Sequence, residues 1–98
     1  MKKEVIVSPA AKTDIAGLKA YIKEELKMPK TAANYITELK NTVKQLSYYA
    51  GSIGINEYVQ NMFGINASHI IFKKMAIIFF IENNIIYIKR IVPSSLIY

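Results

Sequence analysis

The spacing of the apolar residues changes near Ala50, and this change limits the folds that are open to the chain. Before that point, apolar residues recur every three or four positions, as they do on one face of an α-helix. After it, they form short continuous or alternating runs, which are typical of β-strands. The pattern therefore predicts an α+β fold in which the helices precede most of the strands.

The N-terminal segment predicts a short strand over residues 3–7 and a helix that starts directly after it. Ser8 offers a hydroxyl for the N-cap, and Pro9 suits the first helical position. The helix is expected to end at Met28-Pro29, because the residue before a proline is pushed out of the helical region. Its apolar stripe has spacings of four, three, four and four residues: Ala11, Ile15, Leu18, Ile22 and Leu26.

A second helix is predicted to begin near Thr31, which is a plausible cap. Two amphipathic helices separated by so short a break are expected to fold back on each other as an antiparallel hairpin. The apolar stripe of this second helix again follows helical spacing: Ala32, Ile36, Leu39, Val43 and Leu46.

The second half of the chain predicts three or four strands. A stretch that contains Tyr58, Val59 and Phe63 is punctuated by glycines, and we expect one irregular strand there. Residues 69–72 form the next candidate strand, and Lys73-Lys74 forms a turn after it. Residues 75–81 are continuously apolar, as expected of a strand that is buried on both faces. Asn83-Asn84 then indicates a two-residue hairpin turn that leads into a partner strand over residues 85–92.

These elements predict one small α+β domain over residues 1–98, since 98 residues leave room for a single core. It consists of an N-terminal strand, an antiparallel helix hairpin and a three- to four-stranded, mainly antiparallel sheet. Both helix stripes must be buried against one face of that sheet. The other face is left to solvent or to a partner.

The composition excludes several kinds of site. The chain has no cysteine, so a disulfide framework, a thiolate zinc site and a cysteine nucleophile are excluded. A single histidine excludes a multi-histidine metal site, and we expect neither a metal nor a cofactor. The longest apolar run has seven residues, well short of the ~20 of a membrane helix, and no signal peptide is recognisable. A cytoplasmic protein without membrane contact is expected.

The charge balance favours an acidic protein or another polyanion as the partner. The formal net charge is +6, from 13 basic and 7 acidic residues. Arg90 is the one arginine, although proteins that hold phosphates in a fixed geometry rely on the bidentate guanidinium. A solvated, lysine-rich surface explains the charge equally well.

The order of these elements and several local signals resemble the toxins of the RelE/ParE superfamily, which come from bacterial type II toxin–antitoxin pairs. The resemblance covers nearly the whole chain. It is carried by residues 5–15 (VIVSPAAKTDI), Tyr21-Ile22, Ala33, Tyr35, and residues 73–81 and 86–91.

The resemblance implies a toxin that a cognate antitoxin neutralises in a hetero-oligomer. Two activities occur on this fold: RelE-like members cleave messenger RNA in the ribosome, and ParE-like members inhibit DNA gyrase. The nucleases use lysines and arginines of the exposed sheet face and a C-terminal segment rich in arginine, with histidine or tyrosine. Here residues 93–98 contain no arginine, lysine or histidine and retain only Tyr98. This departure favours the ParE-like branch, and a toxin-derived interaction module without toxicity is a further alternative.

Under the nuclease alternative, the candidate catalytic residues are Arg90, His69 and Tyr98. Strand alternation places Arg90 on the face of Ile86 and Ile88, where it would lie at the margin of the sheet and pair with a carboxylate. His69 has an equally ordinary explanation as a surface residue.

The predicted contacts to nucleic acid or to the cellular target are Lys73, Lys74 and Lys89, although Lys73-Lys74 also suits an ordinary charged turn. Tyr49 and Tyr58 are predicted partner-binding residues, because tyrosine supplies a large contact area at a low entropic cost.

Overall fold

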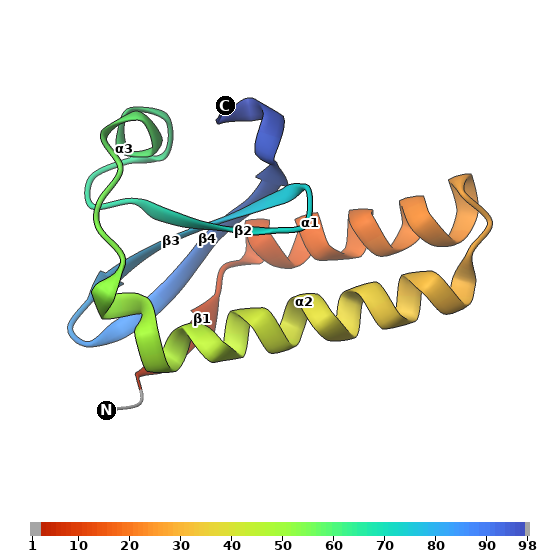
Figure 1. Cartoon of the computed structure of the whole chain (residues 1–98), viewed down its shortest axis with the longest axis horizontal. Coiled ribbons are helices and arrows are strands. Elements are labelled where there is room, and N and C mark those ends of the chain that lie inside the picture. Colours follow the sequence, from red (N-terminus) through yellow and green to blue (C-terminus); the bar gives the residue numbers. More distant parts are fainter. Residues whose placement is uncertain (1–2, 98) are drawn as a thin grey trace.

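A long helix hairpin projects beyond a four-stranded sheet in the computed structural model, which describes residues 3–97 (Figure 1). The first strand leads directly into the hairpin, and a third helix and the other strands follow it. The principal elements are β1 (Glu4–Val7), α1 (Pro9–Ala20), α2 (Pro29–Tyr49), α3 (Glu57–Phe63), β2 (Ser68–Phe72), β3 (Met75–Glu82) and β4 (Ile85–Pro93). No helix among these residues is long and apolar enough to cross a membrane.

The predicted start of α1 is confirmed, and it is also a contact between α1 and the sheet. The Ser8 hydroxyl accepts a hydrogen bond from the Ala11 N–H at 3.0 Å, which satisfies a free N–H at the helix start. The same hydroxyl donates to the Lys89 carbonyl of β4 at 2.9 Å. The Ser8 N–H donates to the Ile88 carbonyl at 3.0 Å. One residue therefore begins the helix and joins it to β4.

Two details of the predicted hairpin are wrong. The second helix begins at Pro29, two residues before the predicted Thr31, because proline occupies the first helical position with Met28 as the N-cap. Leu26 was expected on the buried stripe but is 49% exposed. The segment Tyr21–Glu25 is a π-helix, whose wider turn rotates the residues after it away from the stripe.

The sheet has the strand order β1-β4-β3-β2. β1 runs parallel to β4, while β4–β3 and β3–β2 are antiparallel, so the predicted mainly antiparallel sheet is confirmed. Asn83 and Asn84 have φ angles of 52° and 64°, as the predicted two-residue hairpin turn requires.

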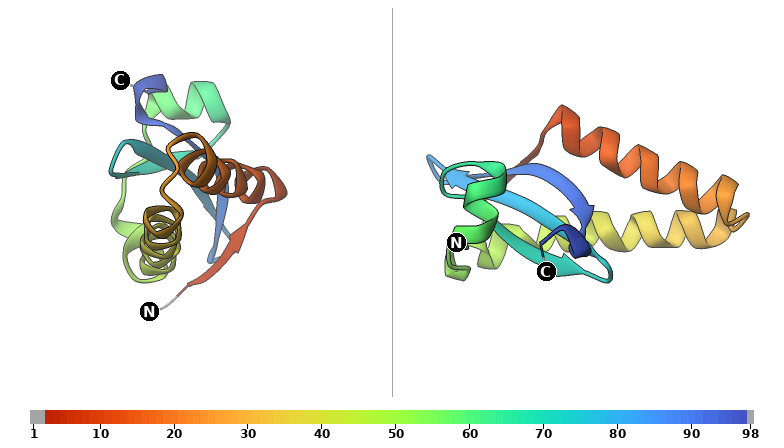
Figure 2. Two further views of the ribbon diagram at one scale, coloured as in Figure 1. Left: turned by 90° about the vertical axis from the view of Figure 1, so that its right-hand side faces the viewer. Right: turned by 90° about the horizontal axis from the view of Figure 1, so that it is seen from above.

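Apolar clusters cover both faces of the sheet, so that the two neighbouring residues Ile77 and Ile78 are fully buried. Figure 2 shows the sheet between the α1–α2 hairpin and a thinner layer made by α3 and the C-terminal turn. The prediction that β3 is buried on both faces is confirmed. The α2 stripe packs on the hairpin side with Ala11, Phe72, Met75, Ile77, Phe79, Ile86, Ile88 and Ile91.

The irregular strand predicted around Tyr58, Val59 and Phe63 is wrong, because this segment is helix α3. The Asn56 side chain caps the helix by accepting a hydrogen bond from the Val59 N–H at 3.0 Å. Gly64 ends the helix with a φ of 116°, which favours glycine. α3 lies on the sheet face that was expected to be open, where it packs on Ala67, Ala76, Ile78, Val92 and Ile97.

The prediction that Arg90 shares a face with Ile86 and Ile88 is wrong, because β4 contains a β-bulge. Arg90 lies opposite Ile78, and Ile88 lies opposite Phe79, so that Lys89 is an extra residue on β4. After the bulge the alternation is reversed: Ile91 joins Ile88 on the hairpin side. Residues directly opposite each other share a face, so Arg90 projects on the α3 side with Ile78.

Replacement of Ser8 by alanine is expected to lower the free energy of unfolding by about 1–2 kcal/mol, because it removes the helix cap and the donor to the Lys89 carbonyl. Urea denaturation followed by circular dichroism measures the change. The control is Thr13→Ala, which removes an exposed hydroxyl bonded to the Pro9 carbonyl and should change this energy by less than about 0.5 kcal/mol. Equal effects of the two substitutions would contradict the dual role of Ser8.

Candidate functional site

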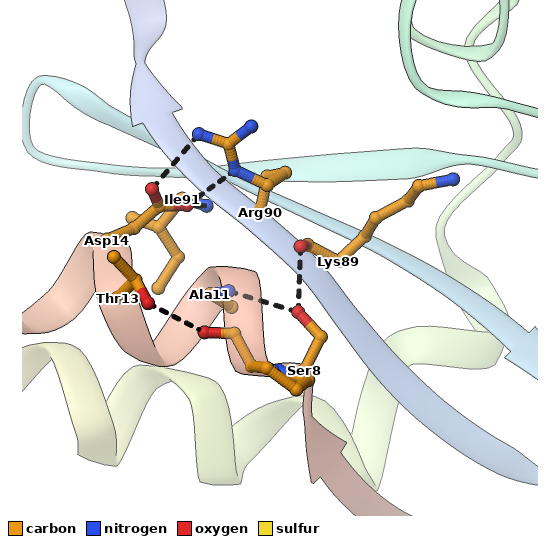
Figure 3. A network of polar contacts seen from close by, with 8 residues as sticks. Ser8, Ala11, Thr13, Asp14, Lys89, Arg90 and Ile91 are labelled. Carbon is orange, nitrogen blue, oxygen red and sulfur yellow. Dashed lines mark hydrogen bonds and ion pairs between the residues drawn. The ribbon is translucent and has the colours of Figure 1, made fainter.

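The carboxylate of Asp14 in α1 connects the helix hairpin to the β4 bulge (Figure 3). It accepts hydrogen bonds from Arg90 Nε at 2.8 Å and from Arg90 Nη2 at 3.0 Å, which is the strong bidentate arrangement. The Ile91 N–H donates to the same carboxylate at 2.9 Å. The predicted pairing of Arg90 with a carboxylate is confirmed, and two of its guanidinium nitrogens are engaged in it.

The environment of Asp14 stabilises its charged form. Partial burial raises the pKa of this carboxyl, but the hydrogen bonds from Arg90 and Ile91, with the charge of Arg90, outweigh the burial. The pKa therefore lies below the ordinary value of 3.8. In turn, the hydrogen bond and the charge of Asp14 raise the pKa of Arg90.

The bulge brings Arg90 and His69 onto the same face of the sheet. His69 of β2 and Arg90 of β4 both lie opposite Ile78 of the intervening β3. Their backbones are two strand spacings apart, or about 10 Å. Burial lowers the pKa of His69, so the imidazole is neutral at pH 7. A neutral imidazole and a cation on one face of a sheet are groups that proton transfer at a phosphodiester can use. The third predicted catalytic residue, Tyr98, lies outside the described residues.

The three predicted contact lysines do not gather at one place. Lys73 Nζ lies 2.8 Å from a carboxylate oxygen of Glu38 in α2, with both side chains more than half exposed. It also lies 5.3 Å from the ring centroid of Tyr35. Lys74 is exposed in the β2–β3 turn. Lys89 extends toward Gly64 at the end of α3. Its Nζ is so close that a side chain at position 64 would have its Cβ 3.0 Å from this nitrogen.

The predicted partner-binding tyrosines are both accessible. Tyr49, at the end of α2, is 38% exposed, and Tyr58 of α3 is 55% exposed.

Within residues 3–97, no group of three or more histidine, aspartate and glutamate side chains is arranged to hold a metal ion.

An apolar groove between α1 and α2 was not predicted from the sequence. It has a volume of about 590 Å³ and is floored by residues of β1 and β4. Four lysines line it, two from each helix, and all four are exposed. Its lining comprises Val5, Val7, Lys12, Ile15, Ala16, Lys19, Ile36, Lys40, Val43, Lys44, Ile88 and Ile91. We call this feature the lysine-rimmed groove.

The spacing of these lysines was a signal for the groove. Lys12 and Lys19 are seven residues apart on α1, and Lys40 and Lys44 are four apart on α2, so each pair lies on one helix face. Each pair flanks the apolar stripe of its own helix. The sequence did not show that the two flanks face each other, because that depends on how the helices pack.

Comparisons with known proteins give matches among solved structures only. No protein-family model matches the chain, and no curated protein matches it. A chain from the chromosomal ParDE TA system of P. aeruginosa superposes with a TM-score of 0.79 at 16% sequence identity, with 94% of this chain and 96% of that chain covered. A chain of the toxin–antitoxin complex RelBE2 from Mycobacterium tuberculosis gives a TM-score of 0.61 at 11% identity, covering 95% and 99%.

These two matches define the class of fold. Both span nearly the full length of each chain, so the likeness covers the whole domain. This chain shares its fold with chains from these two toxin–antitoxin systems, and the fold that the sequence resemblance implied is confirmed.

Replacement of Asp14 by asparagine is expected to lower the free energy of unfolding by about 1–2 kcal/mol at neutral pH, since Arg90 is partly exposed and solvent screens the lost pair. Because the pKa of Asp14 is lowered on folding, its contribution is present above the unfolded-state pKa and is lost as pH falls through the folded-state pKa. The difference between wild type and variant should therefore begin to shrink as pH falls past 3.8 and vanish below the still lower pKa of the folded state. Urea denaturation over a pH series measures it.

The matched control is Glu38→Gln, which breaks the exposed pair with Lys73. This change is expected to cost less than about 0.5 kcal/mol. A difference between wild type and Asp14→Asn that stays constant down to pH 2 would contradict the role given to the Asp14 charge.

Proposed function

We propose that this chain is the toxin of a type II toxin–antitoxin pair, that its cognate antitoxin holds it in a cytoplasmic hetero-oligomer, and that it inhibits growth by binding DNA gyrase without nuclease chemistry. The full-length likeness to chains from two toxin–antitoxin systems supports the first part. The resemblance carried by residues 5–15, 73–81 and 86–91 agrees with this likeness.

The observation that carries the antitoxin part of the proposal is the lysine-rimmed groove. An apolar floor of valine and isoleucine side chains favours a partner with large apolar residues. The four lysines favour a partner that carries carboxylates beside them. An amphipathic, acidic segment of the antitoxin meets both requirements, whether it binds as a helix or as an extended chain.

The absence of a free arginine supports the gyrase part of the proposal. Nuclease chemistry needs a cation at the scissile phosphate, and Asp14 already holds Arg90 in a bidentate pair. Residues 93–97 supply no basic side chain in its place. The superposition on the ParDE chain, with the higher of the two TM-scores, is consistent with the ParE-like branch.

One observation favours ribosome-dependent cleavage of messenger RNA as a second candidate. Arg90 and the neutral His69 share one cross-strand row, and Lys74 and Lys89 add two cations in the same half of the sequence. In this alternative, His69 takes the 2′-hydroxyl proton, and Arg90 exchanges Asp14 for the phosphate. Tyr98 remains a predicted catalytic residue of this alternative.

Reversal of the charge at Lys40 and Lys44 together is expected to weaken antitoxin binding at least tenfold, because two cations at the groove rim become anions beside an acidic segment. Isothermal titration calorimetry with the product of the adjacent gene measures the affinity. Wild-type binding should also weaken as salt is raised.

The control for this experiment is the double variant Lys23→Glu, Lys30→Glu, which makes the same charge change near the tip of the hairpin, outside the groove. Its affinity should stay within about threefold of wild type, since exposed charges beyond a Debye length are screened. Equal weakening by both double variants would place the antitoxin elsewhere.

The purified chain is expected to inhibit DNA supercoiling by gyrase and to leave messenger RNA on translating ribosomes intact. The Asp14–Arg90 pair is the physical reason for the second result, because it removes Arg90 from the phosphate. A gel supercoiling assay and primer extension on the messenger RNA measure the two outcomes. Ribosome-dependent cleavage that Arg90→Ala abolishes in a folded chain would favour the nuclease instead.

A further inference from the structure

The outer side of α3 exposes large apolar side chains. Tyr58 and Met62, one helical turn apart, are 55% and 45% exposed. Ile55 just before the helix is 56% exposed, and Ile65 just after it is 81% exposed. We call these four residues the α3 patch. The opposite side of α3 is fixed to the sheet through the buried Val59, so the patch is presented on a rigid support.

The α3 patch lies in the stretch of sequence that carries the least charge, and Lys89 of β4 approaches it at Gly64. All 13 lysine and arginine residues lie outside residues 45–72, and this stretch contains one acidic residue, Glu57. Elsewhere the chain is strongly basic, with a net charge of +6. Another exposed apolar group, at the hairpin tip, differs in this respect: Leu26 and Met28 lie among Lys23, Lys27 and Lys30.

This distribution of charge favours one kind of binding partner for the α3 patch over the others. The four residues of the α3 patch include no cation that could neutralise the phosphates of a nucleic acid or an anionic membrane, and Lys89, which reaches Gly64, lies at one end of the patch and not within it. An acidic protein gains nothing there beside Glu57, whereas the lysine-rimmed groove attracts it. A second copy of this basic chain is repelled by every lysine-rich surface. It meets the least repulsion where residues 45–72 of one copy face residues 45–72 of the other.

We propose that the α3 patch is a self-association surface, through which two copies of the chain form a dimer about a two-fold axis. Such an axis pairs the two α3 helices antiparallel and places Tyr58 against Met62 of the partner subunit, a favourable contact between sulfur and an aromatic ring. The patch is small, so the dimer is weak and depends on concentration. The lysine-rimmed groove lies across the sheet and stays open in each copy.

The first test is the mass of the purified, antitoxin-free chain, measured by light scattering from about 1 μM to about 1 mM, the range of weak association. The mass should rise from that of one chain toward that of two. Met62→Lys, a change at an exposed position, should raise the dissociation constant at least tenfold, because it places two cations across the axis. Leu26→Lys, a matched change at the hairpin tip, should leave this constant within about twofold. Circular dichroism checks that both variants are folded.

The second test uses the absence of cysteine from the chain. Met62→Cys introduces a single thiol beside the proposed axis, and a short bismaleimide reagent should convert this variant to a covalent dimer. Leu26→Cys should stay largely monomeric under the same conditions.

A single-chain mass across the whole concentration range would overturn the proposal. So would a dimer that persists unchanged in Met62→Lys, or cross-linking that is equal at positions 62 and 26. None of these results bears on antitoxin binding or on gyrase, so the proposal is tested separately from the proposed function.

Discussion

The hydrogen bonds between the start of α1 and the bulge of β4 determine the layout of the rest of the molecule. Ser8 donates to the Lys89 carbonyl, and Asp14 accepts from Arg90 and from the Ile91 N–H. These contacts lie at the bulge and directly after it, where the alternation of β4 reverses. They fix α1 over the sheet, and α1 in turn forms one wall of the lysine-rimmed groove.

The two apolar clusters give the sheet two faces with different roles. On the hairpin side, the helices bury most of the sheet but leave a groove with a strongly basic rim. On the other side, α3 covers part of the sheet and presents a nearly uncharged apolar patch. The difference in charge between the faces separates an acidic partner from a second copy of the chain. The proposed complex therefore combines two contacts that do not compete for one surface.

Much of this architecture could be predicted from local sequence signals. The Ser8-Pro9 helix start, the stripe of α2, the doubly buried β3 and the Asn83-Asn84 turn each depend on nearby residues, and all are confirmed. Helix α3 was missed because glycines on both sides of it resembled strand punctuation. Its signals, Asn56 as a cap and Gly64 as a terminator, were present in the sequence.

The parts of the site that could not be predicted depend on tertiary packing. The bulge at Lys89 is a property of the register between β3 and β4, and it alone decides that Arg90 and His69 share a face. The groove depends on how α1 and α2 pack over β1 and β4, which no spacing within one helix encodes. The pairing of Arg90 with a carboxylate could be predicted, but the identity of its partner, Asp14, required the fold.

The most direct test of the central claim is pulse labelling of DNA and protein synthesis in bacteria after induction of this chain alone. An early fall in DNA synthesis, with protein synthesis following later, is the predicted result. The product of the adjacent gene, co-expressed with the chain, should prevent both effects. An early fall in protein synthesis with DNA synthesis initially unchanged would contradict the account and identify the ribosome as the target.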